Sequence, residues 1–140
     1  SGRTLRVVGS LDQPHSFTYV PDLAAAMIRA ASDPALHGSF LHAPTGPALT
    51  QREMATAFAE AAGVPLPRLG SIPAGALRAV GLVHRDTREL AEMSFQFTAP
   101  FVLDSRHSEQ RLGLEPTPFD TAIRETVAWW RAREDAAVSA

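Results

Sequence analysis

The segment from Phe17 to Ile28 changes its hydrophobic period within a few residues, and this change constrains the fold more than any other feature of the sequence. Up to Val20 it consists of aromatic and β-branched residues, which favour a strand. From Pro21 onward it consists of good helix formers, and proline suits a first helical turn. Apolar positions then recur at helical spacing, at Leu23, Ala26, Met27 and Ala30. We therefore predict a strand that runs directly into a helix ending near Ser32.

Residues 17–24 read Phe-Thr-Tyr-Val-Pro-Asp-Leu-Ala. This octapeptide resembles the F-x-Y-V-x-D-x-A signature found late in NAD(P)-dependent epimerase/dehydratases, the extended short-chain dehydrogenase/reductase family. Further short segments that are similar to the family follow in the same order, at residues 38–42, 49–54, 103–105 and 112–117. The resemblance covers residues 5–131 and extends only to the C-terminal part of such an enzyme. The resemblance implies the α/β fold class. More closely, it implies an α+β-like fragment with several helices and short strands, which is the C-terminal part of a Rossmann-type enzyme.

The length of the chain predicts one folded domain. At 140 residues and 45% hydrophobic content, it can hide about two thirds of its unfolded surface in one core. With the resemblance, we expect a single C-terminal substrate-binding domain over residues 1–133. Residues 134–140 have the composition and position of a disordered tail.

Charge and composition exclude several classes of partner. A net charge of −2 gives no electrostatic footprint for nucleic acid, and no apolar run is long enough to span a bilayer. Without cysteine, the chain has neither disulfides nor thiolate metal sites. The first residues, Ser-Gly-Arg-Thr, do not read as a signal peptide, so we expect a cytoplasmic protein without nucleic-acid or membrane partners. They also lack an initiator methionine, so we expect the chain to be either part of something longer or trimmed of a tag.

The sequence offers no catalytic residue of the kind that the resemblance implies. All thirteen basic residues are arginine, so the Tyr-x-x-x-Lys pair of short-chain dehydrogenases is missing; Leu23 stands where the lysine after Tyr19 would be needed. Glycine-rich dinucleotide turns, G-x-S-x-G elbows and paired metal-binding histidines are also missing. We expect no catalytic, cofactor or metal site on this chain. The NAD or NADP implied by the resemblance would be bound by a missing N-terminal dinucleotide-binding domain.

The loop before Phe17 carries the first candidate site residues. Related enzymes usually have an arginine two residues before this segment, where it can reach a substrate phosphate, and this chain has His15 there. One interpretation makes His15 a substrate-facing donor, with Gln13 and Ser16 beside it. The other makes it a histidine of a surface loop. An arginine can bind a phosphate through two parallel hydrogen bonds, and a histidine cannot. A nucleotide-sugar substrate, which carries phosphates, is therefore less favoured.

A second candidate is the aromatic segment near residue 95. Residues 86–97 predict one helix with Leu90, Met93 and Phe97 on one side, whereas Phe95 points elsewhere. Either a neighbouring element of the same domain covers Phe95, or Met93, Phe95 and Phe97 line a substrate pocket completed by the missing part of the protein. Contact with a second subunit is a further alternative.

Local patterns also predict strands at residues 5–9, 38–43 and 68–72 and a helix that begins at the capping box of Thr50 and Glu53. Asp104 or Ser105 is expected to cap a short helix. Thr117 is expected to cap a last helix whose apolar stripe is Phe119, Ile123, Val127 and Trp130.

These observations support one leading function and two alternatives. The leading hypothesis is the substrate-binding C-terminal portion of an NAD(P)-dependent epimerase, dehydratase or reductase, whose partners are a small-molecule substrate and the dinucleotide-binding domain. One alternative is a redox-sensing or scaffold member of the same superfamily without catalysis. The other is a self-associating interaction module, a homodimer formed through Phe95, Trp129 and an open strand edge.

Overall fold

The computed structural model of the chain describes residues 4–138. The chain divides into two compact units. The first contains the described residues up to His15 together with Ala48–Val102, and the second contains Ser16–Pro47 together with the described residues from Leu103 onward. Each unit therefore joins an early and a late segment, so each depends on contacts between residues far apart in the sequence.

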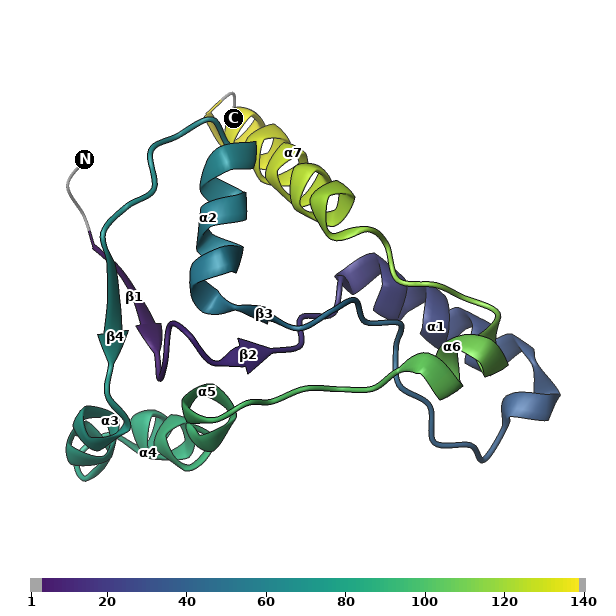
Figure 1. Cartoon of the computed structure of the whole chain (residues 1–140), viewed down its shortest axis with the longest axis horizontal. Coiled ribbons are helices and arrows are strands. Elements are labelled where there is room, and N and C mark those ends of the chain that lie inside the picture. Colours follow the sequence, from purple (N-terminus) through teal and green to yellow (C-terminus); the bar gives the residue numbers. More distant parts are fainter. Residues whose placement is uncertain (1–3, 139–140) are drawn as a thin grey trace. The chain divides into compact units, whose positions relative to one another are not determined.

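The first unit contains two small sheets. Strand β1 (Leu5–Val8) pairs in parallel with β4 (Leu69–Ile72), and β2 (Pro14–His15) pairs antiparallel with β3 (Leu49–Thr50) (Figure 1). Strands at β1 and β4 are expected from the sequence, and their register aligns Leu5 with Leu69. Parallel strands need a long connection, which here contains the second sheet, the helix that follows it and residues 16–47 of the second unit.

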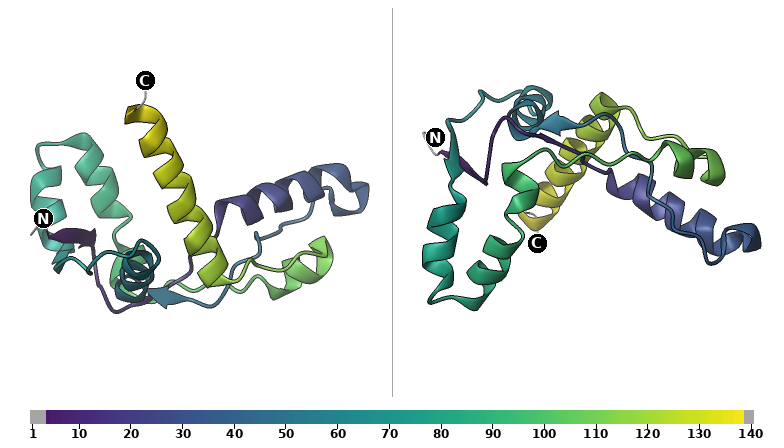
Figure 2. Two further views of the ribbon diagram at one scale, coloured as in Figure 1. Left: turned by 90° about the horizontal axis from the view of Figure 1, so that it is seen from above. Right: turned by 60° about the horizontal axis from the view of Figure 1, so that its bottom comes forward.

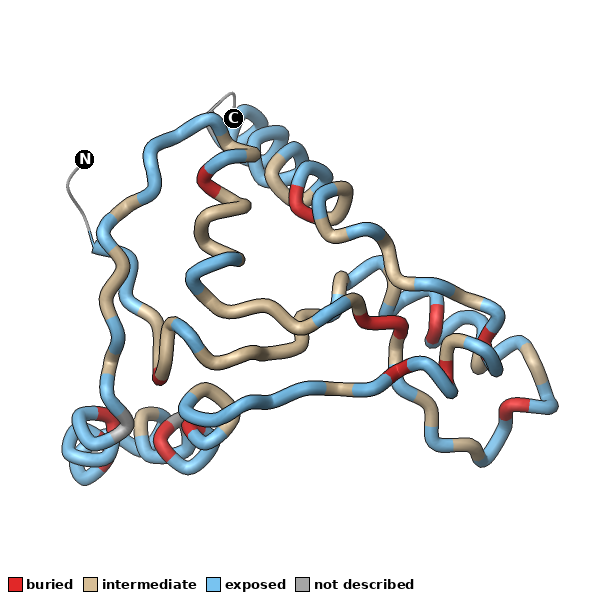
Figure 3. The backbone as a smooth tube through the Cα atoms, in the orientation of Figure 1, coloured by how far each residue is buried: buried red, intermediate tan, exposed pale blue. Residues whose placement is uncertain are grey.

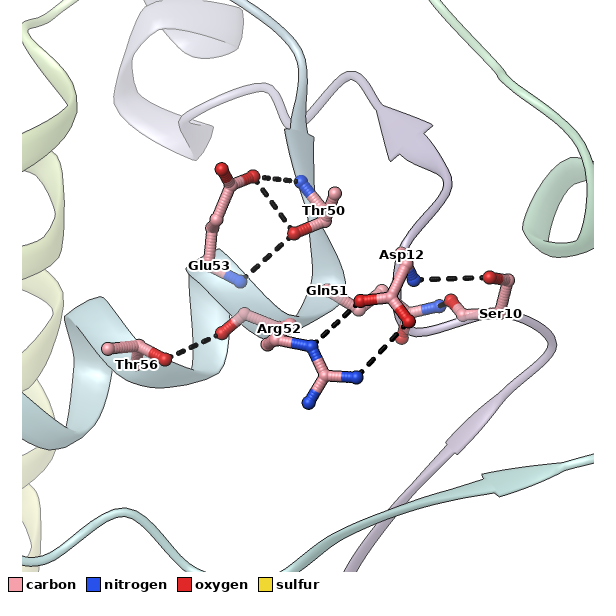
Figure 4. Close-up of polar contacts among 7 residues, drawn as sticks. All are labelled: Ser10, Asp12, Thr50, Gln51, Arg52, Glu53 and Thr56. Carbon is pink, nitrogen blue, oxygen red and sulfur yellow. Dashed lines mark hydrogen bonds and ion pairs between the residues drawn. The ribbon is translucent and has the colours of Figure 1, made fainter.

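Helix α2 (Gln51–Ala61) begins at the predicted capping box. The backbone N–H of Glu53 donates to the Thr50 hydroxyl at 3.1 Å, and the Glu53 carboxylate accepts from the Thr50 backbone N–H at 2.7 Å (Figure 4). These two bonds satisfy donors that a helix start otherwise leaves unpaired. The capping box thus fixes where α2 begins.

Helices α3 (Ala74–Gly81) and α4 (Arg85–Glu92) pack against one another, as Figure 2 shows. The helix predicted through residue 97 breaks after α4, and α5 (Phe95–Thr98) is separate. At the break, the buried Ser94 hydroxyl donates to the Ala91 carbonyl at 2.6 Å. A serine that bonds back to its own helix competes with the regular backbone ladder, which accounts for the interruption.

The second unit is helical and is built around a small apolar core. Its elements are α1 (Val20–Ser32), η1 (Pro34–Leu36), α6 (Arg106–Leu112) and α7 (Phe119–Val138). Ala26, Leu36 and Leu112 form the buried cluster, from three of these elements (Figure 3). Helix α1 begins one residue before the predicted Pro21 and ends at the predicted Ser32.

Buried hydroxyl groups connect the early and late segments of this unit. The Ser105 hydroxyl accepts from the Thr45 backbone N–H at 3.1 Å, and the Ser108 hydroxyl accepts from the His42 backbone N–H at 2.9 Å. Both serines are only 3% exposed. Of the two predicted caps of α6, Asp104 accepts from the Arg106 backbone N–H at 3.1 Å, whereas Ser105 bonds across the unit.

Two strands predicted from the sequence do not form. Residues 17–19 and 38–43 are not strands, although Leu41 and Ala43 pack on the core while Phe40 is fully exposed. The described part of the second unit contains no strand, so these segments have no partner within that unit with which to form a ladder. The predicted segments therefore have the side-chain alternation of a strand but no neighbouring strand to bond with.

The start of α7 also differs from its prediction. The Thr117 hydroxyl donates to the Asp22 carboxylate at 2.6 Å, and the Thr117 backbone N–H donates to it at 2.8 Å. The Pro118 carbonyl instead accepts the first bonds of the helix, from Thr121 and Ala122. Asp22 therefore joins the first turn of α1 to the segment that begins α7.

Helix α7 continues through Val138, past residue 134 where the sequence predicts a disordered tail. Residues 139–140 lie outside the described residues. Of the predicted apolar stripe, Ile123 is buried, whereas Trp130 is 56% exposed and contacts Trp129 edge to face, with ring centroids 4.9 Å apart. Only the first part of the stripe therefore belongs to the core.

Replacing Asp22 tests its role as the connection to α7. We expect Asp22→Ala to lower the free energy of unfolding by about 2 kcal/mol, because two hydrogen bonds to one carboxylate are lost. Urea unfolding followed by circular dichroism measures the change. The matched control is Asp120→Ala in the same unit, which removes an exposed ion pair with Arg124 and should change stability by less than about 0.5 kcal/mol. Equal losses in the two variants would contradict this role.

Candidate functional site

The turn after β1 brings two distant segments of the first unit into direct contact. Gly9 has a φ of +77°, and a Cβ placed there would lie 2.3 Å from the carbonyl oxygen of Phe97. The Ser10 backbone N–H donates to that same carbonyl at 2.7 Å. Only glycine allows both the left-handed backbone and this approach. Gly9 therefore fixes the place of Phe97 relative to β1.

His15 lies where three segments of the first unit meet. Its ring stacks on Phe97, with centroids 5.5 Å apart and planes inclined by 6°, and on Phe101, at 5.4 Å and 29°. On one side β2 pairs with β3. The Phe101 backbone N–H also donates to the Pro14 carbonyl at 3.0 Å, and Phe101 forms a parallel bridge with His15. Both backbone pairing and ring stacking therefore hold the imidazole.

The start of α2 holds the loop that leads to His15. The Gln51 side-chain amide donates to the carbonyls of Val8 and Ser10, at 3.0 and 3.2 Å, and the Arg52 backbone N–H donates to the Leu11 carbonyl at 3.1 Å. Figure 4 shows these side chains gathered at the helix start. The loop is thus bound at successive carbonyls by one helix turn that its own capping box fixes.

An ion pair also connects this loop to the start of α2. The Arg52 guanidinium donates to both oxygens of the Asp12 carboxylate, at 2.7 and 3.1 Å (Figure 4). Hydrogen bonding from Arg52 lowers the pKa of Asp12 below its ordinary value of 3.8, and the charge of the arginine adds to the effect. Both side chains are exposed, so solvent screens the pair and its contribution to stability is small. The hydrogen-bond donors of Arg52 that face the loop are therefore already used by a carboxylate of the same chain.

The structure brings some of the predicted site residues together. His15 and Phe97 are in contact, and Gln13 lies half-buried in the loop beside them. Met93 and Phe95 belong to the same unit but are 52% and 60% exposed. Ser16 belongs to the second unit, where its hydroxyl accepts from the Leu103 backbone N–H at 2.9 Å.

Several residues that build this site are not found by sequence reasoning. In the sequence, Phe101 lies in a short apolar run, and Gln51 and Arg52 lie in the first turn of a helix that its capping box already explains. Gly9 is the exception, since a glycine directly after a strand pattern is a known signal for a special backbone conformation. Contacts of Gln51 and Phe101 span dozens of residues, and no local pattern reports them.

Two other features are absent from the part of the chain that the structure describes. Among the described residues, no group of three or more histidine, aspartate or glutamate side chains is placed to hold a metal ion. No helix in residues 4–138 has the length and apolar character needed to cross a membrane.

Adding a methyl group at Gly9 tests the close approach to Phe97. We expect Gly9→Ala to destabilise the chain by at least about 2 kcal/mol, because it combines backbone strain with a steric clash. The matched control is Gly75→Ala in the same unit, where a Cβ meets open space within α3 and a gain of up to about 1 kcal/mol is expected. Thermal unfolding compares the two. If Gly9→Ala left the melting temperature unchanged, the close contact between Gly9 and the Phe97 carbonyl would not be required for the fold.

Removing Arg52 tests the ion pair. In Arg52→Gln, the pKa of Asp12 should rise toward 3.8, which ¹³C NMR of the carboxyl carbon measures. A lowered pKa in the folded chain means that the pair stabilises at pH values above the unfolded pKa and that this stabilisation is lost as the pH falls through the folded value. Arg85→Gln, which removes an exposed pair with Glu89, should leave Asp12 unchanged. The ion pair is disproved if Asp12 titrates identically in Arg52→Gln and the parent chain.

Comparison with known proteins extends this description. No family model and no curated protein matches the sequence. Among solved structures, the chain is similar to a nucleoside-diphosphate-sugar epimerase from Staphylococcus aureus, with a TM-score of 0.64 and 15% identity, over 85% of this chain and 43% of that chain. It is also similar to the NADPH-dependent quinone oxidoreductase QOR2 from Escherichia coli, complexed with NADPH, with a TM-score of 0.55 and 20% identity, over 89% of this chain and 44% of that chain.

The chain therefore spans less than half the length of these two structures. At such identities the likeness is one of fold. It confirms the fold class that the sequence resemblance implies: a helix-rich chain with short strands that is similar to the C-terminal part of Rossmann-type NAD(P)-dependent epimerase and reductase folds.

Proposed function

We propose that this chain is the substrate-binding C-terminal portion of an NAD(P)-dependent epimerase, dehydratase or reductase. The observation that carries the proposal is the fold likeness, which spans 85% and 89% of this chain and under half of a nucleoside-diphosphate-sugar epimerase and of an NADPH-dependent quinone oxidoreductase. A further segment then binds the dinucleotide and performs the hydride and proton transfers. This portion binds the substrate and selects among substrates.

The residues present do not fit a dinucleotide site of their own. The junction from β4 to α3 is a strand-to-helix turn of the kind that binds pyrophosphate, and Gly70 and Gly75 lie on either side of it. Gly70, however, lies inside the strand opposite Arg6, and the residue capping α3 is Pro73, which has no N–H to offer a phosphate. We therefore assign NAD(P) to a segment other than this one and derive no step through the cofactor here.

The surface around His15 is the part of the chain best suited to contact the substrate. Its imidazole carries polar nitrogens between two aromatic rings, and the surrounding loop is held by the start of α2. The exposed part of the Phe101 ring, which stacks on His15, can pack against a ring of the substrate. The role of this surface is to bind and position, whereas the reacting groups belong to the dinucleotide-binding segment.

Calorimetry on the 140-residue chain tests this division of roles. Titration with NADPH, and separately with NADH, should give no binding tighter than millimolar, because the chain lacks a turn that cradles the pyrophosphate. Urea unfolding of the same sample shows that it is folded. Micromolar affinity for either dinucleotide would refute the proposal, since the cofactor site would then lie on this chain.

A further inference from the structure

We propose that the surface around His15 takes a flat, uncharged ring compound as its substrate, and not a nucleotide or another phosphate-bearing compound. This inference rests on the proposed function, because it names the substrate class of the same surface. The surface consists of the loop 9–15 and the aromatic segment 93–102, which Gly9 and His15 hold together.

The geometry of the three rings favours a flat partner. The planes of His15 and Phe97 are inclined by only 6°, so this place in the fold already accommodates one flat ring on another. Aromatic rings attract one another in offset stacks, beyond the burial of their area. A flat aromatic substrate can extend such a stack with its whole face.

The aromatic segment also leaves much apolar surface uncovered. Met93, Phe95, Phe101 and Val102 are 52%, 60%, 42% and 63% exposed. All four belong to the first unit, and Phe101 contacts His15 directly. Exposed apolar side chains concentrated in one short segment mark a surface that binds an apolar partner. Of these four side chains, Phe101 is the one that the ring stacking places directly against His15.

Charge decides between an uncharged ligand and a phosphate. Loop 9–15 and segment 93–102 contain no lysine or arginine, and their only charged side chain is the carboxylate of Asp12. Arg52, the arginine beside the loop, already donates to both oxygens of that carboxylate. Phosphate recognition relies on cationic side chains that bind the phosphate oxygens. A pyrophosphate here would meet an anion and an arginine that is already engaged.

Three soluble probes separate the possible ligand classes by NMR of the 140-residue chain. Menadione is flat and uncharged, camphor is an apolar ketone without a flat ring, and UDP-glucose carries a pyrophosphate. The chain has no cysteine, so menadione forms no thiol adduct. We expect menadione to shift the ring resonances of His15 and Phe101 in a saturable way. Camphor and UDP-glucose should produce much smaller shifts at equal concentration.

Variants test whether stacking carries the binding. Phe101→Leu keeps an apolar side chain but removes the flat ring, and the apparent Kd for menadione should rise about five-fold. The matched control is Phe40→Leu, a fully exposed phenylalanine of the second unit, which should leave the Kd unchanged. If Phe101→Leu fails to fold, Phe95→Leu replaces it, because that side chain is 60% exposed.

The outcomes distinguish failure of this inference from failure of the proposed function. Saturable shifts by menadione that Phe101→Leu weakens support the inference. Shifts of His15 by UDP-glucose, equal shifts by camphor, or none with menadione up to its solubility limit overturn the substrate class. None of these results bears on the proposed function, which fails only if the same sample binds NADPH or NADH with micromolar affinity.

Discussion

The approach of the Phe97 carbonyl to Gly9 is the contact on which the first unit depends. It places the end of β1 against α5 with no room for a side chain, and the Ser10 backbone N–H bonds to the same oxygen. The Ser71 hydroxyl donates to the Gly9 carbonyl, which ties β4 to the same turn. Once this turn is fixed, the loop after it passes the start of α2 and delivers His15 to Phe97 and Phe101.

In the second unit, distant segments of the chain are joined mainly by hydrogen bonds of buried polar groups. The apolar core of this unit is small, and buried polar groups carry much of the connection. Thr45 and Ser105 bond to each other through backbone and hydroxyl groups, and Asp22 accepts two bonds from Thr117. Buried hydroxyls that are fully bonded specify one arrangement of the chain, because any other arrangement would leave them unpaired.

The proposed division of roles follows from the distribution of chemistry along the chain. The described residues offer rings, an imidazole and apolar surface in one unit, whereas lysine is absent from the whole sequence. A substrate-selecting portion needs shape and stacking, and a hydride-transferring portion needs a dinucleotide cradle and proton donors. The properties of this chain suit the first requirement, which is the reason for the proposed division.

The sequence by itself determined α1 and the capping box that begins α2, because propensity, capping and apolar spacing are local properties. The break after α4 and the start of α7 depend on contacts that local patterns do not contain. The sequence also predicted His15 and Phe97 as site residues, which stays a prediction, although their rings are in contact. Only the tertiary structure decided that Phe101 stacks on His15, that Gln51 holds the loop, and that residues 38–43 lack a strand partner. Strand pairing and ring stacking join residues that are far apart in the chain. The local sequence around each residue therefore does not show which partner it will have.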